Sequence, residues 1–346
     1  MKIGIVNDLP LAREALRRVV AARGHDVIWL AGNGAEAVDL ASRQKADLVL
    51  MDLVMPGVDG AEATRRIMAQ SPCPVLVVTS SVSGHLCKVY EAMGHGALDA
   101  VDTPSLGPGG EITGAAHLLD KIATIERLQG LSRVNAHHSC PARPECPRTS
   151  NDLLVVIGSS TGGPSALAEV LDDVPRNWPA SVIVIQHVDA AFAEGLGNWL
   201  AERSGLRVEL AREGQRPEVG KVHLAGTNDH LVIDCEGRFR YTDQPREMSF
   251  RPSVDVCFQS LAAHWHVPGV AVLLTGMGRD GAQGMLALRR KGWATIAQDQ
   301  STSVIWGMPR AAVENGGAAR VLPVSEIGAA VVNEVGLRVR NERATS

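Results

Sequence analysis

Short runs of apolar and β-branched residues alternate with longer amphipathic stretches from the start of the chain. In the first part of the chain, the runs that predict strands are residues 2–7, 26–31, 47–51, 74–79 and 97–101. The stretches between them, such as residues 12–23, repeat their apolar side chains at helical spacing. Strands that alternate with helices form a parallel sheet covered on both faces. We therefore expect an α/β domain with a doubly wound (βα)5 fold over residues 1–125.

This pattern stops in the middle of the chain and then starts again. Residues 130–150 contain several prolines and show no apolar periodicity, which predicts a linker, and we place it at 126–151. Beyond it, strands are predicted at 153–157, 181–186, 207–211, 221–224, 270–275 and 294–297, with helices at 165–171, 191–203, 254–264 and 281–290. Residues 231–241 predict a hairpin inserted in that sheet. A second α/β domain with a mostly parallel sheet is expected over residues 152–340.

Composition excludes several classes of protein. The 346 residues are 45% hydrophobic and 21% charged, with a net charge of −4 and no concentrated basic stripe, so nucleic acid and anionic membranes are not expected partners. No apolar run approaches the roughly 20 residues of a membrane span. The first residues run directly into Asp8 instead of a signal sequence. We expect a cytoplasmic protein without membrane insertion.

The six cysteines have no C-x-x-C spacing and predict buried free thiols. The cluster of His137, His138, Cys140 and Cys146 lies in the proline-containing stretch without a second ligand pair, so a solvated linker is favoured there over a metal site.

Polar residues end three of the predicted strands in the first domain. Asp8 follows the first strand, Asp52 the third, and Thr79 ends the fourth. Ligands of open parallel sheets bind at this carboxyl edge. Two carboxylates suit a hard cation such as Mg²⁺, and a carboxylate such as Asp52 can accept a phosphoryl group. Taken alone, Asp8 is better explained as a helix cap.

The surrounding residues are more specific. The segments DLVMPGVDG at 52–60 and AMGHGA at 92–97, with Asn7, Asp8 and Thr79, resemble the receiver domain of two-component response regulators over roughly residues 1–125. The resemblance implies Asp52 as the phospho-acceptor for a histidine kinase and Thr79 as the switch hydroxyl. It also implies Mg²⁺ bound by Asp8, Asp52 and the carbonyl of Val54.

Two residues depart from the receiver pattern. Asn7 stands where receivers usually have a second acid, which removes one negative charge from the cation site. Thr103 stands where they usually have the lysine that pairs with the phosphoryl oxygens. We expect phosphorylation to remain possible but its effect to be altered.

In the second domain, the segment GSSTGG at 158–163 follows a predicted strand and opens a predicted helix. It fits G-x-S-x-G, in which a sharp turn exposes a nucleophilic serine, here Ser160, beside backbone N–H groups that can stabilise an oxyanion. A phosphate-binding loop and a plain tight turn are the alternatives.

A base and an acid are available at the same sheet edge. His187 follows the predicted strand 181–186, and His230 is the weaker alternative. Asp280 follows the strand 270–275, although it also fits a helix cap, and Asp229 competes for the same role. Residue pattern alone leaves the acid open.

Four segments taken together resemble the catalytic domain of the chemotaxis protein-glutamate methylesterases: GSSTGG at 158–163, QH at 186–187, RPSVD at 251–255 and LTGMGRDG at 274–281. The resemblance implies Ser160 as nucleophile, His187 as general base and Asp280 as the acid that orients it. The backbone N–H of Met277, with that of Thr161, is the implied oxyanion donor.

A receiver followed by this domain resembles the methylesterase response regulators. The implied reaction is metal-free hydrolysis of glutamate γ-methyl esters on a chemoreceptor signalling domain, with glutamine deamidation as a second activity. The segments VND at 6–8, AGNGAEA at 31–37 and VDTP at 101–104 look more like the branch found in Wsp-type pathways, which signal through a cyclic dinucleotide. A phosphorylation-dependent receptor-binding protein without enzyme activity is the alternative.

Overall fold

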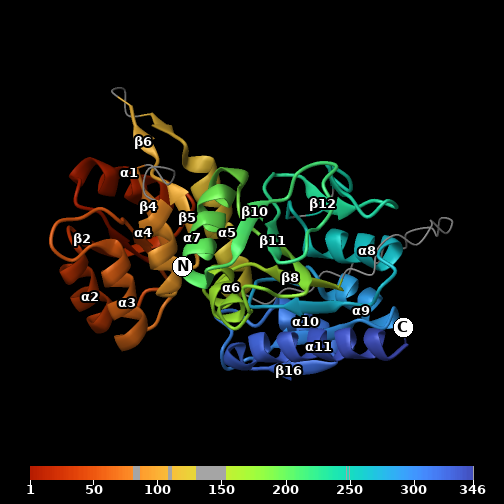
Figure 1. Ribbon diagram of the computed structural model, residues 1–346. Helices are drawn as coiled ribbons and strands as arrows, with labels where there is room; N and C mark the ends of the chain where they lie inside the picture. The colour runs from red at the N-terminus through yellow and green to blue at the C-terminus, as the bar shows by residue number, and fades with distance from the viewer. Residues whose placement is uncertain (81–85, 108–110, 130–152, 247, 249, 346) are drawn as a thin grey trace. The chain divides into compact units, whose positions relative to one another are not determined.

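The computed structural model describes residues 1–80, 86–107, 111–129, 153–246, 248 and 250–345 (Figure 1). The chain divides into two compact units, Met1–His138 and Ser139–Ser346. Each has its own buried apolar core.

The first unit is a five-stranded parallel sheet in the order β2-β1-β3-β4-β5, as the alternating pattern predicts. Its strands are β1 (Lys2–Val6), β2 (Asp26–Ala31), β3 (Leu48–Met51), β4 (Val75–Thr79) and β5 (Asp99–Asp102). Its helices are α1 (Pro10–Ala21), α2 (Gly34–Arg43), α3 (Gly60–Gln70), α4 (Leu86–Gly94) and α5 (Ala115–Gln129). A small antiparallel pair, β6 (Ser105–Leu106) and β7 (Ile112–Thr113), was not expected.

Local side chains set where two of these helices begin. Asn33 accepts a hydrogen bond from the backbone N–H of Glu36 at the start of α2, and Asp59 does the same for Glu62 at the start of α3. Helix α5 ends at Gln129, so residues 126–129 of the expected linker are helical. The rest of the expected linker, with its histidine and cysteine cluster, lies outside the described residues.

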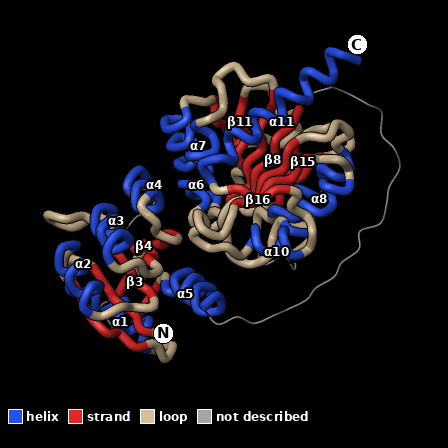
Figure 2. Tube along the Cα trace, turned by 90° about the horizontal axis from the view of Figure 1, so that it is seen from below, coloured by secondary structure: helices blue, strands red, loops and turns tan. Residues whose placement is uncertain are grey.

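The second unit is a seven-stranded parallel sheet in the order β10-β11-β9-β8-β14-β15-β16 (Figure 2). Its strands are β8 (Leu153–Ser159), β9 (Ala180–Gln186), β10 (Arg207–Leu210), β11 (Lys221–Leu224), β14 (Val270–Leu273), β15 (Ala294–Gln298) and β16 (Arg320–Leu322). Its helices are α6 (Gly163–Asp172), α7 (Ala190–Ser204), α8 (Val254–His264), α9 (Ala282–Arg290), α10 (Met308–Glu314) and α11 (Val324–Thr345). Helices α8, α9 and α10 share one apolar core on the sheet, whereas α6 packs against α7 and α11.

Two expectations for this unit are corrected. The hairpin, β12 (His230–Ile233) and β13 (Phe239–Thr242), forms a separate antiparallel sheet and is not inserted in the main sheet. Cys235, in the turn between its strands, is exposed and not buried. Cys73 and Cys257 are buried free thiols as expected, and burial raises the pKa of Cys73 to about 11.

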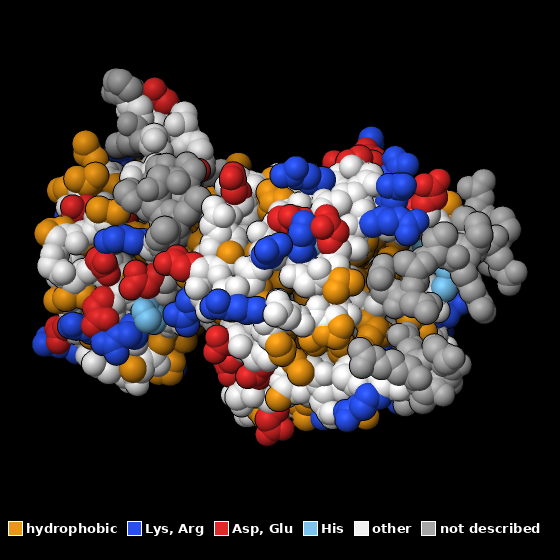
Figure 3. Space-filling view, in the orientation of Figure 1, with side chains coloured by type: hydrophobic (Ala, Val, Ile, Leu, Met, Phe, Trp, Pro, Cys, Tyr) orange, Lys and Arg blue, Asp and Glu red, His pale blue; other side chains and the backbone are white. Residues whose placement is uncertain are grey.

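Charged side chains of both signs are interspersed on the face seen in Figure 3. On the hairpin, Arg240 pairs with Glu213 and Asp234, and Arg238 pairs with Glu236. These arginines therefore do not form an uncompensated basic surface. Within the described part of the chain, no helix is long and apolar enough to cross a membrane.

Candidate active site

Three central strands of the second unit end at the same edge of the sheet. Ser159, the last residue of β8, is paired with Gln186, the last residue of β9, and the backbone N–H of His187 donates to the carbonyl of Ser159 at 3.0 Å. On the other side of β8, Gly158 is paired with Leu273 at the end of β14. Ser160 and His187 thus follow neighbouring strand ends, and the loop that carries Asp280 follows the third.

Ser160 lies in a sharp turn between β8 and α6. Its backbone N–H donates to the carbonyl of Thr275, and its carbonyl accepts from the N–H of Gly163 and the side-chain amide of Gln186. Gly162 adopts φ of 76°, a conformation that favours glycine, and directly precedes the helix. The strand, turn and helix match the context that G-x-S-x-G requires, and Ser160 is only 7% exposed.

His187 and Asp280 form a short, buried pair. The Nε2 of His187 lies 2.7 Å from Oδ2 of Asp280, and both side chains are almost wholly enclosed. The sequence alternatives are not arranged in this way. His230 Nδ1 accepts a hydrogen bond from the backbone N–H of Ser253, and its Nε2 lies 3.2 Å from the carbonyl of Pro245. Both ring nitrogens therefore contact the loop before α8.

The carboxylate of Asp280 lies at the N-terminus of α8. It accepts hydrogen bonds from the hydroxyl of Ser253 at 2.8 Å and from the backbone N–H groups of Val254 and Asp255 at 2.7 and 2.9 Å. Burial alone would raise the pKa of Asp280, but the hydrogen bonds from His187, Asp255 and Ser253 outweigh it and hold that pKa below its usual range. The Asp280 carboxylate is therefore held as an anion, and it accepts a hydrogen bond from Nε2–H of His187.

The second ring nitrogen of His187 is available for chemistry. Its Nδ1 is buried and has no hydrogen-bond partner among the described residues. The ring is stacked on that of Phe250, with centroids 4.4 Å apart and planes within 8°. With its proton on Nε2, the imidazole presents a lone pair at Nδ1. Sequence reasoning missed Phe250, because nothing in the local pattern indicates which ring it contacts.

The two candidate oxyanion donors lie beside Ser160. Met277 follows Gly276, where an added Cβ would come within 2.8 Å of Cβ of Ser160. Gly276 is fixed by backbone hydrogen bonds with Ile305, Gly307 and Met308. The carbonyl of Thr161 accepts from the hydroxyl of Thr275 at 3.0 Å. The role of the two backbone N–H groups as oxyanion donors stays a prediction.

The receiver residues gather at the carboxyl edge of the first sheet. The backbone N–H of Asp52 donates to the carbonyl of Val6, which places Asp52 beside the Asn7–Asp8 pair. The Oδ1 of Asp52 accepts from the backbone N–H of Leu53 at 2.7 Å. Asp52 is 7% exposed, whereas the side chain of Val54 is exposed.

The residues at this edge fit a magnesium ion. Asp8, Asp52 and the carbonyl of Val54 offer the oxygen ligands that a hard cation prefers. Asn7 turns its side-chain oxygen to the backbone N–H of Leu9 at 2.9 Å, a local turn just before α1, which has no side-chain cap. In the described part of the chain no three acidic, histidine or cysteine side chains are grouped for a metal, and Asn7 in place of an acid leaves this edge with two carboxylates.

Two threonine hydroxyls near this edge have no partner. The Oγ1 atoms of Thr79 and Thr103 are buried without a hydrogen bond to any described residue. The backbones of the two residues are joined, since the N–H of Thr103 donates to the carbonyl of Thr79 at 2.8 Å. Buried polar groups are normally satisfied, so two open hydroxyls here are what a phosphoryl-binding edge would provide.

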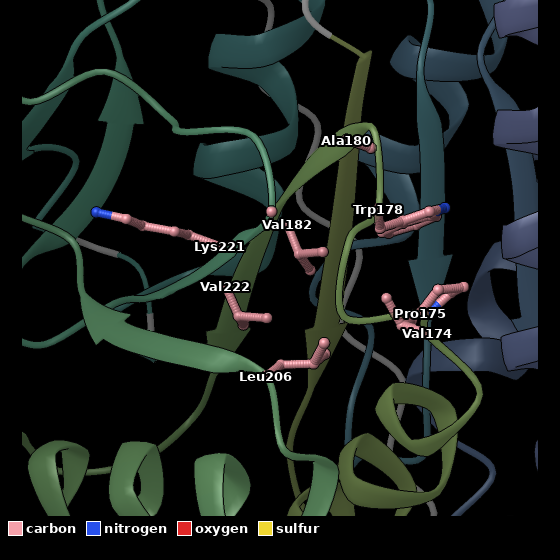
Figure 4. Close-up of a pocket in the computed structure, with 9 residues that line it drawn as sticks. Val174, Pro175, Trp178, Ala180, Val182, Leu206, Lys221 and Val222 are labelled. Atoms are coloured by element: carbon pink, nitrogen blue, oxygen red, sulfur yellow. The ribbon is translucent and has the colours of Figure 1, made fainter.

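A small apolar hollow lies at the other end of the second sheet. Figure 4 shows Trp178, Val182 and Val222 among its lining residues, near the starts of β9 and β11. The catalytic candidates all lie at the opposite ends of the strands, so the hollow plays no part in their chemistry.

Comparison with known proteins agrees with both halves of the chain. Residues 155–331 match the CheB methylesterase family and residues 3–105 the response regulator receiver domain. A protein-glutamate methylesterase/protein-glutamine glutaminase of Burkholderia thailandensis is 52% identical over 97% of this chain and 98% of its own length. One from Pseudomonas putida is 51% identical over 94% of this chain and 97% of its own. The crystal structure of the Thermotoga maritima CheB methylesterase catalytic domain matches 53% of this chain and 99% of that domain, with 34% identity and a TM-score of 0.51.

Proposed function

The chain belongs to the CheB methylesterase family, and on that premise we propose that it is a phosphorylation-regulated protein-glutamate methylesterase. Its substrate is the γ-methyl ester of glutamate on a chemoreceptor signalling domain, and the products are glutamate and methanol. The observation that carries the proposal is the buried His187–Asp280 pair at the strand end next to the Ser160 turn.

The reaction proceeds through an acyl-enzyme. The Oγ of Ser160 attacks the ester carbonyl while Nδ1 of His187 takes its proton, and the backbone N–H groups of Met277 and Thr161 stabilise the oxyanion. The tetrahedral intermediate collapses, and the leaving methoxide takes the proton from His187 to give methanol. Water, deprotonated by His187, then attacks the acyl carbonyl and releases glutamate and free Ser160. Asp280 stays ionised throughout and stabilises the imidazolium.

The same residues can hydrolyse a glutamine amide, with ammonia as the leaving group in place of methanol. The relatives from Burkholderia and Pseudomonas carry both activities in their names. Nucleophile, base and orienting acid are all side chains of this unit, so the proposed hydrolysis assigns no role to a metal.

The receiver unit controls the esterase. Asp52 accepts a phosphoryl group from a chemosensory histidine kinase, and Thr79 is the switch hydroxyl. Asp8, Asp52 and the carbonyl of Val54 would hold Mg²⁺, which would neutralise negative charge at this site. The protein works in the cytoplasm on receptor domains, without binding nucleic acid or entering the membrane. Its place in a Wsp-type pathway stays a prediction from the sequence.

The competing function is receptor binding without catalysis, and a methanol-release assay on methylated receptor separates the two. Ser160→Ala, His187→Ala and Asp280→Asn should each lower kcat by about 10³-fold or more, because the three side chains act as a unit. The thermal unfolding midpoint of Ser160→Ala should stay near that of the wild type. Asp229→Asn serves as the control and should keep wild-type activity. Wild-type turnover by Ser160→Ala would establish the binding function instead, and a loss in Asp229→Asn but not in Asp280→Asn would reassign the acid.

A further inference from the structure

Helices α8 and α9 begin side by side, and each has its N-terminus capped by a carboxylate from the other's segment. Asp280, just before α9, accepts the backbone N–H groups of Val254 and Asp255 in the first turn of α8. In return, Asp255 in α8 accepts the backbone N–H of Gly284 in the first turn of α9 at 2.6 Å. The N-cap of α9 is Gly281, which has no side chain to do this. Asp255 therefore supplies a cap that the local sequence of α9 lacks.

Glycine at position 284 allows this close approach. A Cβ on Gly284 would lie 2.4 Å from Cβ of Phe258 and 3.0 Å from the carbonyl oxygen of Asp255. The two helix starts are thus in direct contact. A displacement of one of them is transmitted to the other, because neither has free space to absorb it.

The pKa values of the two carboxyl groups, Asp255 and Asp280, are shifted in opposite directions. Burial and the charge of Asp280 raise the pKa of Asp255 to about 7, against the opposing effect of backbone N–H groups at the start of α9. The pKa of Asp280 is lowered by the bonds it receives from His187, Asp255 and Ser253, in spite of its burial. Because the pKa of Asp255 is raised and that of Asp280 is lowered, the two neighbouring carboxyl groups do not both have to be ionised. The catalytic carboxyl, Asp280, is the one that stays an anion.

We propose that Asp255 is a positioning residue for the esterase reaction, which holds the Asp280 segment against the start of α8 so that the Asp280 carboxylate meets Nε2 of His187. It contacts no reacting atom. It acts through two bonds, the one from Gly284 to its side chain and the one from its own N–H to Asp280. The inference rests on the proposed function, because it assigns a role relative to that catalytic pair.

The test measures kcat and KM of the full chain on methylated receptor. Asp255→Ala removes the cap of α9 and should lower kcat by about ten-fold to 100-fold with KM within two-fold, since small displacements of catalytic groups have effects of this size. Asp255→Asn keeps an oxygen that accepts from Gly284 and should recover kcat to within about three-fold of wild type. Asp255→Glu keeps the charge but moves it by one methylene, and should recover less than Asn.

The matched control is Asp234→Ala. Asp234 accepts from the backbone N–H groups of Glu236 and Arg238 in the β12–β13 turn, so its loss removes a comparable cap away from the catalytic pair. Its kcat should equal that of the wild type. Wild-type kcat in Asp255→Ala, or equal impairment of the Ala and Asn variants, would overturn the inference.

Two further measurements decide the outcome if Asp255→Ala does not fold or if the proposed function itself is wrong. If Asp255→Ala does not fold, the comparison of Asn with Glu decides, and a Glu variant as active as Asn or more active would overturn the role in positioning. Ser160→Ala is assayed beside them. An active Ser160→Ala would remove the proposed function itself, whereas an inactive one together with an unaffected Asp255→Ala would remove only this inference.

Discussion

At His187 the two ring nitrogens have different surroundings, and that difference assigns their roles. Nε2 lies against the Asp280 carboxylate, while Nδ1 is buried and unpartnered among the described residues. The sequence places His187 at a strand end and Asp280 after another, but the rotation of the ring depends on Phe250 and Asp280, which are distant in the chain. The identity of the basic nitrogen could therefore not be predicted from the sequence.

The carboxyl group of Asp255 makes stability depend on pH. Its pKa is about 7 in the folded protein against an ordinary value of 3.8, so between these limits the folded state binds a proton that the unfolded state has lost. The free energy of unfolding should therefore decrease as pH rises from about 4 to 7. Asp255→Asn cannot ionise, and its unfolding free energy should decrease less over this range. Asp280 is present in both proteins, so the difference between the two curves reports the ionisation of Asp255 together with its interaction with Asp280.

Urea unfolding of the wild type and of Asp255→Asn at intervals between pH 4.5 and pH 7.5 measures this difference. The variant should gain stability relative to the wild type as the pH is raised. Two curves that stay parallel across the range would show that Asp255 has a pKa near its ordinary value in the folded protein.

The contact between helices α8 and α9 depends on a residue without a side chain. Gly284→Ala places a Cβ against Phe258 and the backbone of Asp255, and overpacking of this kind costs about 1 to 3 kcal/mol. Gly197 is the matched control, since it is also inside a helix but an added Cβ there would have its nearest contact at 3.8 Å. Gly197→Ala should stabilise the protein by about 0.4 to 1 kcal/mol. Thermal unfolding checks both variants, and equal changes in the same direction would show that the helices can separate without cost.

Elements that are buried on both faces could be predicted from the sequence. Every residue of β8, β9 and β14 is buried, and such strands read as continuous apolar runs, so their expected positions differ from the observed ones by at most two residues at either end. The short strand β16 was missed, because its three residues are partly exposed at the sheet edge and show no apolar run. Helices α10 and α11 were also not assigned.

Non-local pairing explains the remaining differences. The hairpin of β12 and β13 could be recognised from its turn, but which strands it would pair with is decided by distant segments. Likewise, the segment RPSVD at 251–255 could be noticed as a motif, while the role of Asp255 depends on the start of α9, almost thirty residues further on. Residues that act on their own sequence neighbours are predictable, and residues that act across the fold are not.

For the molecule as a whole, the proposed activity depends on how a phosphoryl group on Asp52 is held. Receivers usually have a lysine where this chain has Thr103, and the hydroxyls of Thr103 and Thr79 are buried without a partner among the residues that the structure describes. A threonine hydroxyl can donate one hydrogen bond to a phosphoryl oxygen, but it carries no charge. A neutral hydrogen bond is roughly half as strong as a charge-assisted one. The phosphorylated state should therefore favour the active conformation less than in a receiver that has the lysine.

Thr103→Lys tests this argument. A ligand shifts a conformational equilibrium only by its differential affinity for the two states, so an ammonium that binds the phosphoryl group in the active state should enlarge the shift. Methanol release is measured with and without a small-molecule phosphodonor and Mg²⁺, and the gain on phosphorylation should be larger in Thr103→Lys than in the wild type. Thr113→Lys adds the same charge at an exposed position of β7 and should leave the gain unchanged.

The phosphodonor should label the wild type but not Asp52→Asn, which shows that the gain comes from this site. If the wild type is already fully activated and Thr103→Lys gives no larger gain, another group of this chain performs the role of the lysine, and the neutral hydroxyl of Thr103 does not limit the response.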